Sequence, residues 1–235
     1  MTSAKDIILK PINSKLAIRF VKAHHYSGKV ASNSQLHFGV FLNGRLGGVM
    51  SYGPSLDKRK TQRLVKDTGW NDFLELNRMA FSDWLPRNSE SRALAMSFRL
   101  IKKYYPHIEW IISFADATQC GDGTIYRAAG FTLTGIKKNN TIWQAPDGTK
   151  HTDIGLRLGK TINRTTLTKG NNAGKTNGAS SMRIYKEMGY APLPGFQIRY
   201  VYFLNKAAKE RLTVPELPYS AIIKAGASMY KGENL

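Results

Sequence analysis

The sequence predicts an α/β (α+β) fold with a central mixed, mostly antiparallel sheet flanked by helices and followed by a C-terminal extension. Residues 110–115 form an apolar run that is too short for a helix and is typical of a strand buried on both faces. The dipeptide Asn43-Gly44 lies between two apolar-rich runs and predicts a β-hairpin, because both turn residues need positive φ. Residues 88–105 place apolar side chains on one helical face, so strands and helices alternate along the chain.

The first part of the chain supplies a strand, a helix and the hairpin. Residues 7–10 can form the first strand, and Ser14 can cap a helix that ends near the polar loop 24–28. The hairpin then pairs residues 36–42 with residues 45–53.

A basic segment follows and leads to a strand and a long helix. Residues 57–66 carry five basic side chains and one acid without an apolar stripe, which indicates a mobile basic loop. Residues 74–81 have the pattern of a strand. Pro106 ends the helix of residues 88–105.

Residues 107–131 form a unit of strand, polar loop, helix and strand, around which we expect the fold to be organised. Asp116 stands at the carboxyl end of the strand, Asp122 can cap the helix, and Gly130 suits the left-handed residue that stops it. Ligands of open α/β sheets bind outside the carboxyl ends of strands. The side chains expected at this mouth are Asp116, Cys120 and Tyr126.

The remaining residues divide the chain into three regions. Strand-like pieces at 132–136, 141–144 and 152–158 complete the sheet of a catalytic core that spans residues 1–158. Residues 159–181 are poor in apolar side chains and rich in Gly, Asn, Thr and Lys, which predicts an exposed basic excursion. We expect residues 182–235 to pack on the core as a C-terminal strand and helix extension.

The charge of the chain indicates a polyanionic partner. The 235 residues include 35 Lys and Arg against 16 Asp and Glu, and the net charge of +19 favours nucleic acid first and an anionic cofactor second. The single cysteine excludes an intrachain disulfide. The sequence has no run of about eighteen apolar residues and no charged-then-apolar leader, so we expect a cytoplasmic protein without a membrane span.

The order of elements resembles that of the GNAT acetyltransferase superfamily. The blocks HHYSG, LELNRMAF, PRNSESRAL and SFADATQCGDGTIYRAAGF, with the distal ASSMRIYKEMGYAPLPGFQIRYVYFL, resemble the Mom family of bacteriophage DNA-modification proteins. The resemblance implies an acetyltransferase-like fold and a transferase. It also implies conversion of adenine at N6 to N6-carbamoylmethyladenine in double-stranded phage DNA. This change protects the phage DNA from restriction in the cytoplasm of the bacterial host.

The resemblance gives Tyr126 and Asp116 candidate catalytic roles. Tyr126 lies where the acetyltransferase superfamily often has a tyrosine that protonates the departing thiolate of coenzyme A, and a phenol of pKa about 10 suits that leaving group. Asp116 can accept a proton from the adenine N6 amine. The structural alternatives are a tyrosine packed on the sheet and a carboxylate that caps the loop.

Arg78 and the start of the long helix form the expected donor site. Arg78 can direct its guanidinium at the substrate or at donor phosphates, whereas strict alternation places Glu75 and Asn77 on the other face. An ion pair of Arg78 with a carboxylate is the structural alternative. Free N–H groups at the helix start favour a pyrophosphate. The residues expected to bind it are Arg87, Asn88, Ser89 and Ser91, and Ser91 is also a catalytic candidate.

This donor loop departs from the superfamily pattern, because it has no glycine and contains Glu90. Close approach of a pyrophosphate is therefore disfavoured, which leaves the donor open between acetyl-coenzyme A and another activated small molecule. The family product joins N6 to a methylene carbon, whereas acetyl transfer would leave an amide on nitrogen.

His25 and Tyr26 can bind a metal, stack on a base or act as acid and base. Together with Asp116 they offer oxygen and nitrogen ligands compatible with iron, although adjacent histidines alone are weak evidence for a metal. The role we prefer for Tyr26 is an aromatic wall for an extruded base. Cys120 has no identifiable activating base, so we expect a structural role.

The expected mechanism begins with basic side chains that hold duplex phosphates without reading the sequence. These side chains are Lys58, Arg59, Lys60, Arg63 and Lys66. The adenine must then leave the stack before N6 can react. Two other functions stay open: an N-acetyltransferase for a protein, RNA or small amine, and a DNA-binding protein without activity. The C-terminal residues can cover the sheet edge or pair with a second subunit in a homodimer.

Overall fold

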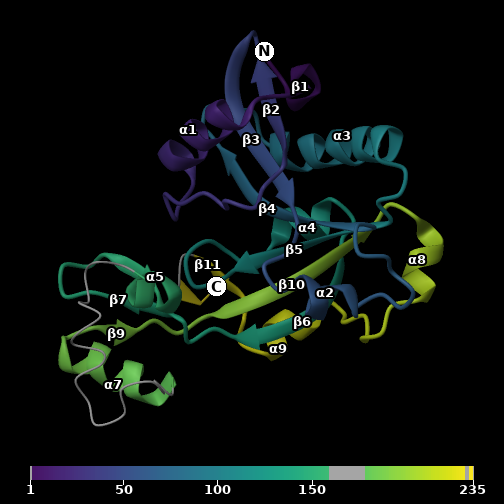
Figure 1. Ribbon diagram of the computed structural model, residues 1–235. Helices are drawn as coiled ribbons and strands as arrows, with labels where there is room; N and C mark the ends of the chain where they lie inside the picture. The colour runs from purple at the N-terminus through teal and green to yellow at the C-terminus, as the bar shows by residue number, and fades with distance from the viewer. Residues whose placement is uncertain (1, 159–177, 231–232, 235) are drawn as a thin grey trace.

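A seven-stranded mixed sheet forms the centre of the protein, in the order β1-β2-β3-β4-β5-β10-β6 (Figure 1). The computed structural model describes residues 2–158, 178–230 and 233–234. Neighbouring strands are antiparallel except β4 and β5, which are parallel. The strands are β1 (Ile8–Pro11), β2 (Leu36–Leu42), β3 (Arg45–Gly53), β4 (Phe73–Phe81), β5 (Trp110–Asp116), β6 (Thr132–Lys138) and β10 (Phe196–Phe203). The predicted mixed, mostly antiparallel sheet flanked by helices is confirmed.

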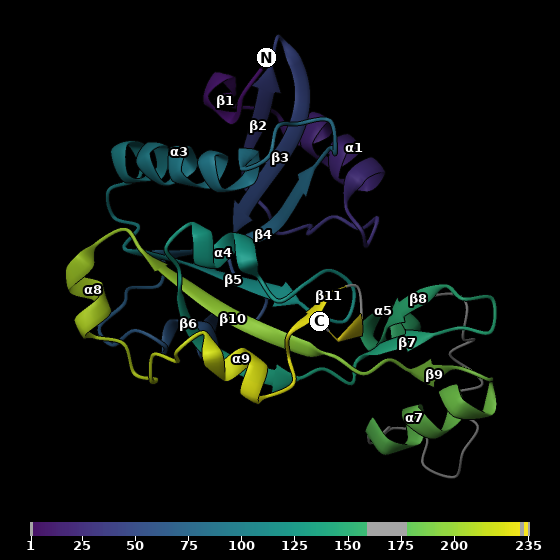
Figure 2. The same ribbon diagram turned by 180° about the vertical axis from the view of Figure 1, so that it is seen from behind.

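Helices cover both faces of this sheet (Figures 1 and 2). The helices of one face are α1 (Ser14–His24) and α2 (Lys58–Gln62), and those of the other are α3 (Ser89–Tyr104), α4 (Thr124–Ala128) and α9 (Ser220–Lys224). The strand β5 packs against both layers. Trp110 and Ile112 contact the cluster of Val65 near α2, whereas Ile111 packs in the cluster of Leu94 from α3. Its apolar run therefore forms a strand buried on both faces, as predicted.

The hairpin is formed by β2 and β3 with the predicted turn. Asn43 has φ 51° and Gly44 has φ 78°, so both turn residues adopt the left-handed region.

Two predicted caps are each shifted by one residue. Asn13 caps α1 in place of Ser14, because its Oδ1 accepts the Leu16 N–H at 2.9 Å. Gly123 is the cap residue of α4, and the Asp122 carboxylate accepts the Thr124 N–H from just outside the helix.

The prediction of a mobile loop at residues 57–66 is wrong, because this segment contains the helix α2. Asp57 caps it by accepting the Lys60 N–H at 3.2 Å. Leu64 and Val65 follow the helix and are buried with Trp110. These apolar side chains hold the basic segment against the sheet.

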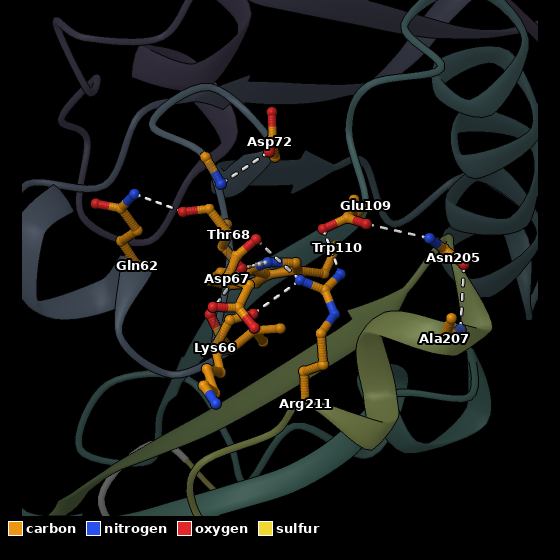
Figure 3. Close-up of polar contacts among 12 residues, drawn as sticks. Gln62, Lys66, Asp67, Thr68, Asp72, Glu109, Trp110, Asn205, Ala207 and Arg211 are labelled. Carbon is orange, nitrogen blue, oxygen red and sulfur yellow. Dashed lines mark hydrogen bonds and ion pairs between the residues drawn. The ribbon is translucent and has the colours of Figure 1, made fainter.

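A polar network fixes the loop after α2 (Figure 3). Arg211, which follows α8 (Lys206–Glu210), pairs with Glu109 at 2.6 Å and donates to the carbonyls of Lys66 and Asp67 at 2.7 and 3.0 Å. Asn205 donates to the other oxygen of Glu109 at 3.1 Å. Glu109 directly precedes β5, so the basic segment is fixed relative to the central strand.

A second sheet of three short strands lies beside the first. It consists of β7 (Ile142–Gln144), β8 (Lys150–Thr152) and β9 (Ala191–Pro192) in the order β8-β7-β9. The pieces predicted at 141–144 and 152–158 therefore do not complete the main sheet. Residues 153–158 form the helix α5 (Asp153–Leu158), because Thr152 accepts the Gly155 N–H at 3.0 Å and starts a helical turn.

The predicted basic excursion is described only at its end. Residues 159–177 lie outside the described residues. Residues 178–181 form the start of α7 (Gly178–Glu187). Tyr185 of this helix is buried with Trp143 in a small separate core.

The C-terminal region contributes to the interior of the main sheet. Strand β10 lies between β5 and β6 and pairs with both. The last strands, β11 (Met229–Tyr230) and β12 (Glu233–Asn234), reach the loop after β5 through a bridge between Gly121 and Tyr230. The division of the chain at residues 158 and 181 stays a prediction. Among the described residues, no helix is long and apolar enough to cross a membrane.

Candidate active site

A cavity of about 630 Å³ lies where β4 and β5 separate. The two parallel strands pair only from Phe73–Glu75 to Trp110–Ile112. Their later residues diverge, and residues 75–79 and 114–116 line the space between them. This volume lies within the range of small-molecule and cofactor sites.

A β-bulge in β4 brings Glu75 to the same side of the strand as Arg78. Ser51 pairs with Arg78, but the next residue, Tyr52, pairs with Leu76, so Asn77 is the extra residue. The bulge reverses the alternation, and Glu75, Asn77 and Arg78 all line the cavity. The prediction that Glu75 and Asn77 face away from Arg78 is therefore wrong.

Glu75 is a cavity carboxylate that the sequence interpretation missed. Ser55 donates a hydrogen bond to its Oε2 at 2.6 Å. Burial raises the pKa of the Glu75 carboxyl, and the Ser55 hydrogen bond and the Arg78 charge oppose this rise. The available signal was an acidic side chain close to Asn77 and Arg78 in the same strand.

Asp116 ends β5 and lines the cavity, as its position at the strand end predicted. Its Oδ1 accepts the Thr118 N–H and its Oδ2 accepts the Gln119 Nε2–H, both at 3.0 Å. The carboxylate thus caps the loop, which was the structural alternative. Each oxygen has a second lone pair, so the cap leaves acceptor capacity for a substrate.

Tyr126 lines the same cavity from α4. Its ring contacts Phe131 and Tyr200, with centroid distances of 5.2 and 5.3 Å. Burial raises the pKa of the Tyr126 phenol to about 12, so it keeps its proton at neutral pH. Helix α4 lies on the sheet face opposite α1 and α2. Because β4 and β5 separate here, Tyr126 and Asp116 line the same cavity.

His25 and Tyr26 lie at the end of α1 and also line the cavity. Their rings are 4.2 Å apart, and Tyr26 is 51% exposed. Burial of the phenol, followed by the Asp116 charge, raises the pKa of Tyr26. Burial and then Arg78 lower the pKa of His25 to about 4. His25 Nδ1 lies 2.8 Å from the Ser27 hydroxyl oxygen and 3.2 Å from the Ser27 backbone nitrogen, so Ser27 fixes this edge of the neutral ring.

Arg78 holds the loop that carries His25. Its Nε donates to the Lys29 carbonyl at 2.9 Å and its Nη1 donates to the Asn77 carbonyl at 2.6 Å. Arg78 also lines the cavity, and a guanidinium has more N–H groups than these two bonds use, so it can orient an anionic group there.

The expected donor loop lies apart from the cavity lining. Ser89 is buried and donates to the Pro86 carbonyl at 2.6 Å, and Ser91 donates to the Asn88 carbonyl at 3.2 Å. Asn88 adopts a left-handed φ of 71°, and Arg87 is exposed beside it. The two hydroxyls bond to the loop itself, so a pyrophosphate here would depend on the backbone N–H groups of the helix start, and this donor site stays a prediction.

His25, Tyr26 and Asp116, the residues proposed for iron, all line the cavity, but only two of them are of the His, Cys, Asp and Glu types. In the part of the chain that the structure describes, no group of three or more His, Cys, Asp and Glu side chains is placed to hold a metal ion. An iron site is therefore not supported by the described residues.

The predicted phosphate-binding residues lie on and after α2. Arg59, Lys60, Arg63 and Lys66 are exposed. Lys58 is held at 4.6 Å above the Trp70 ring and donates to Asn71 Oδ1 at 3.1 Å. Leu56, just before the helix, lines the cavity, which places this basic segment beside the cavity mouth.

Two features of the cavity lining had no strong signal in the sequence. Met229 and Tyr230 reach it from the C-terminal end of the chain, Ile142 reaches it from the second sheet, and Asn139 reaches it from the loop before that sheet. Their positions depend on long-range packing. Cys120, in contrast, lines the cavity as expected and is exposed.

The chain matches a known protein family over most of its length. A family model described as the Mom protein family matches residues 6–221. The chain is 34% identical over 211 residues to the methylcarbamoylase Mom of Escherichia phage Mu, covering 89% of this chain and 80% of that protein.

Solved acetyltransferases are similar at greater distance. The ribosomal-protein-S18-alanine N-acetyltransferase of Escherichia coli aligns with a TM-score of 0.45 and 10% identity, covering 85% of this chain and 94% of that chain. A spermidine/spermine N-acetyltransferase of Vibrio cholerae aligns with a TM-score of 0.44 and 9% identity, covering 88% and 98%. Similarities of this size carry no argument about chemistry.

The family match and the phage Mu relative bear on the predicted identity. The match covers most of the chain, and the relative is an enzyme by name. The prediction of a transferase related to the Mom proteins is confirmed on these two findings, and the chain belongs to the Mom protein family.

Proposed function

We propose that the protein is a phage DNA-modification enzyme that converts adenine in double-stranded DNA to N6-carbamoylmethyladenine and so protects phage DNA from host restriction. The observation that carries this proposal is the cavity that brings Asp116, Glu75 and Tyr126 together beside a basic helix. The phage Mu relative, named a methylcarbamoylase, supports the type of group that is transferred.

The substrate enters as an extruded base, because N6 cannot be approached for attack inside a stacked duplex. The half-exposed Tyr26 ring offers a wall on which the base can stack. The neutral His25 ring, held through Nδ1 by Ser27, can form a hydrogen bond to the base through Nε2. The exposed side chains of Arg59 and Lys60 bind phosphates without reading the sequence.

The transfer joins N6 to a methylene carbon of an activated small-molecule donor. The N6 lone pair forms the new bond, and the leaving group departs with the electrons of the bond that breaks. Asp116 takes the proton that N6 loses, and Tyr126, still protonated at neutral pH, gives a proton to the leaving group. Arg78 orients the donor. Such a reaction takes place in the cytoplasm of the bacterial host, where the phage DNA lies.

Nucleoside mass spectrometry of DNA from bacteria that express the protein tests the proposal. We expect deoxyadenosine to gain the mass of a carbamoylmethyl group and the DNA to resist restriction, and Asp116→Ala to abolish both changes. Asp147→Ala is the matched control, because Asp147 accepts the Thr149 N–H in the same kind of turn but does not line the cavity.

Two other results would contradict the proposal. Acetyl groups on a protein, RNA or small amine, with unchanged DNA, would identify an N-acetyltransferase. Binding of DNA with a steep salt dependence and no covalent change would identify a DNA-binding protein.

A further inference from the structure

Leu56 combines high exposure with a position at the cavity. Its side chain is 88% exposed, more than any other large hydrophobic side chain in the described residues. It is also one of the residues that line the cavity. A single exposed leucine is common on protein surfaces, so what distinguishes Leu56 is its place in the lining of the cavity.

The backbone on both sides of Leu56 is anchored, so its exposure does not come from a loose loop. Ser55 is buried and donates to Glu75 at 2.6 Å, and the Pro54 carbonyl accepts hydrogen bonds from Asn33 and Asn77. After Leu56, Asp57 caps α2. Leu56 is therefore the fixed tip between a strand end and a helix.

The surroundings of Leu56 are those of a surface that meets a polyanion. Arg59 and Lys60 are exposed on the helix that starts two residues later. Tyr26, also half exposed, lines the same cavity and lies at the end of α1, on the same sheet face as α2. Trp70 is also half exposed, but Lys58 lies 4.6 Å above its ring, so cations accompany the apolar side chains of this surface, as the phosphates of a duplex require.

We propose that Leu56 is an apolar wedge that enters the duplex beside the target adenine and fills the space that the base leaves when it passes into the cavity. This inference rests on the proposed function, because it assumes that DNA is the substrate. A wedge replaces part of the stacking that extrusion removes, and Tyr26 receives the base on the other side. Leu56 acts on the DNA opening and takes no part in bond formation.

Fluorescence of 2-aminopurine tests the wedge without any donor. The probe is a pool of duplexes with random flanking sequence, each carrying one 2-aminopurine in place of adenine, whose emission rises when the base is unstacked. We expect the wild-type protein to raise the emission and Leu56→Ala to lower that rise about tenfold, because extrusion is then unaided. Leu56→Met, which keeps an apolar tip, should restore it.

Ile223→Ala is the matched control, because Ile223 is 72% exposed on α9 and does not line the cavity. An equal emission for Leu56→Ala and wild type at saturating protein overturns the wedge, as does an equal loss for Ile223→Ala. Binding of a single strand that carries 2-aminopurine needs no extrusion. If Leu56→Ala weakens this binding as much as it lowers the emission with the duplex, Leu56 contacts the base inside its site, and the wedge is also overturned. If wild type raises the emission but DNA in expressing cells is unmodified, the proposed reaction fails and the wedge stands.

Discussion

At the residue scale, two carboxylates of one cavity have different surroundings. Asp116 accepts hydrogen bonds on both oxygens from the loop that follows it, whereas Glu75 is buried with the Ser55 hydroxyl and has a raised pKa. Paired groups whose environments differ can divide acid and base roles. Asp116 was predictable because it follows an apolar strand. Glu75 was not, because a bulge of one residue decides the face on which it lies.

His25 gives a pH-dependent prediction at this scale. Its pKa is about 4 in the folded protein, against an ordinary value of 6.5. Between these two pH values the unfolded chain binds a proton that the folded protein does not, so stability falls as pH falls from 6.5 to 4 and is fully retained above 6.5.

Urea unfolding at neutral pH and near pH 4.5 measures this effect. We expect His25→Asn to lose less stability on acidification than wild type. His24→Asn, at the exposed neighbouring position, should lose as much as wild type. An equal loss for wild type and His25→Asn would show that the imidazole does not contribute.

At the element scale, the sequence predicted the elements that depend on residues close together in the chain. The Asn43-Gly44 hairpin and the apolar β5 strand were predicted, because turn residues and uninterrupted apolar runs act over a few residues. The helix α2 was missed because its anchors, Leu64 and Val65, lie beyond it and bury against Trp110. The helix α5 was missed because a threonine cap outweighed a strand-like composition.

Gly123 gives a prediction for the element that positions Tyr126. Its φ is 86°, and an added Cβ would lie 2.5 Å from the Tyr200 ring. Gly148 has φ 83° with nothing within 4 Å of the added Cβ. Gly148→Ala should therefore cost about 1 kcal/mol of unfolding free energy from the left-handed conformation alone.

Gly123→Ala should cost more than this control, because it adds a steric conflict at the start of α4. Thermal or urea unfolding of the two variants measures the difference. Equal losses in the two variants would mean that the Tyr200 ring moves aside at no cost, and α4 would then not depend on this contact.

At the scale of the whole molecule, strand order was not predictable from local patterns. The strand β10 was expected, but its place between β5 and β6 depends on pairing between segments far apart in the chain. The same long-range packing brings Tyr230 and Ile142 to the cavity. Composition predicted a polyanionic partner through the charge of +19, without indicating which face meets it.

The salt dependence of DNA binding tests which face carries the phosphate contacts. Arg59→Ala and Lys60→Ala should each weaken binding to a similar extent for all DNA sequences. Each should also reduce, by about 1, the slope of the logarithm of the binding constant against the logarithm of the salt concentration. Lys224→Ala, on α9 of the opposite face, should leave both unchanged. A larger effect of Lys224→Ala than of the α2 variants would place the DNA on the other face.

The central claim is that Asp116 and Tyr126 act in the same step on one bound base. The initial rate of modified deoxyadenosine formation in extracts of expressing cells, which supply the donor, tests it for Asp116→Asn, Tyr126→Phe and the double variant. Because groups that act as a unit have non-additive effects, the double variant should be about as slow as the slower single variant. Rate losses that multiply, or single variants as fast as wild type, would contradict the shared site.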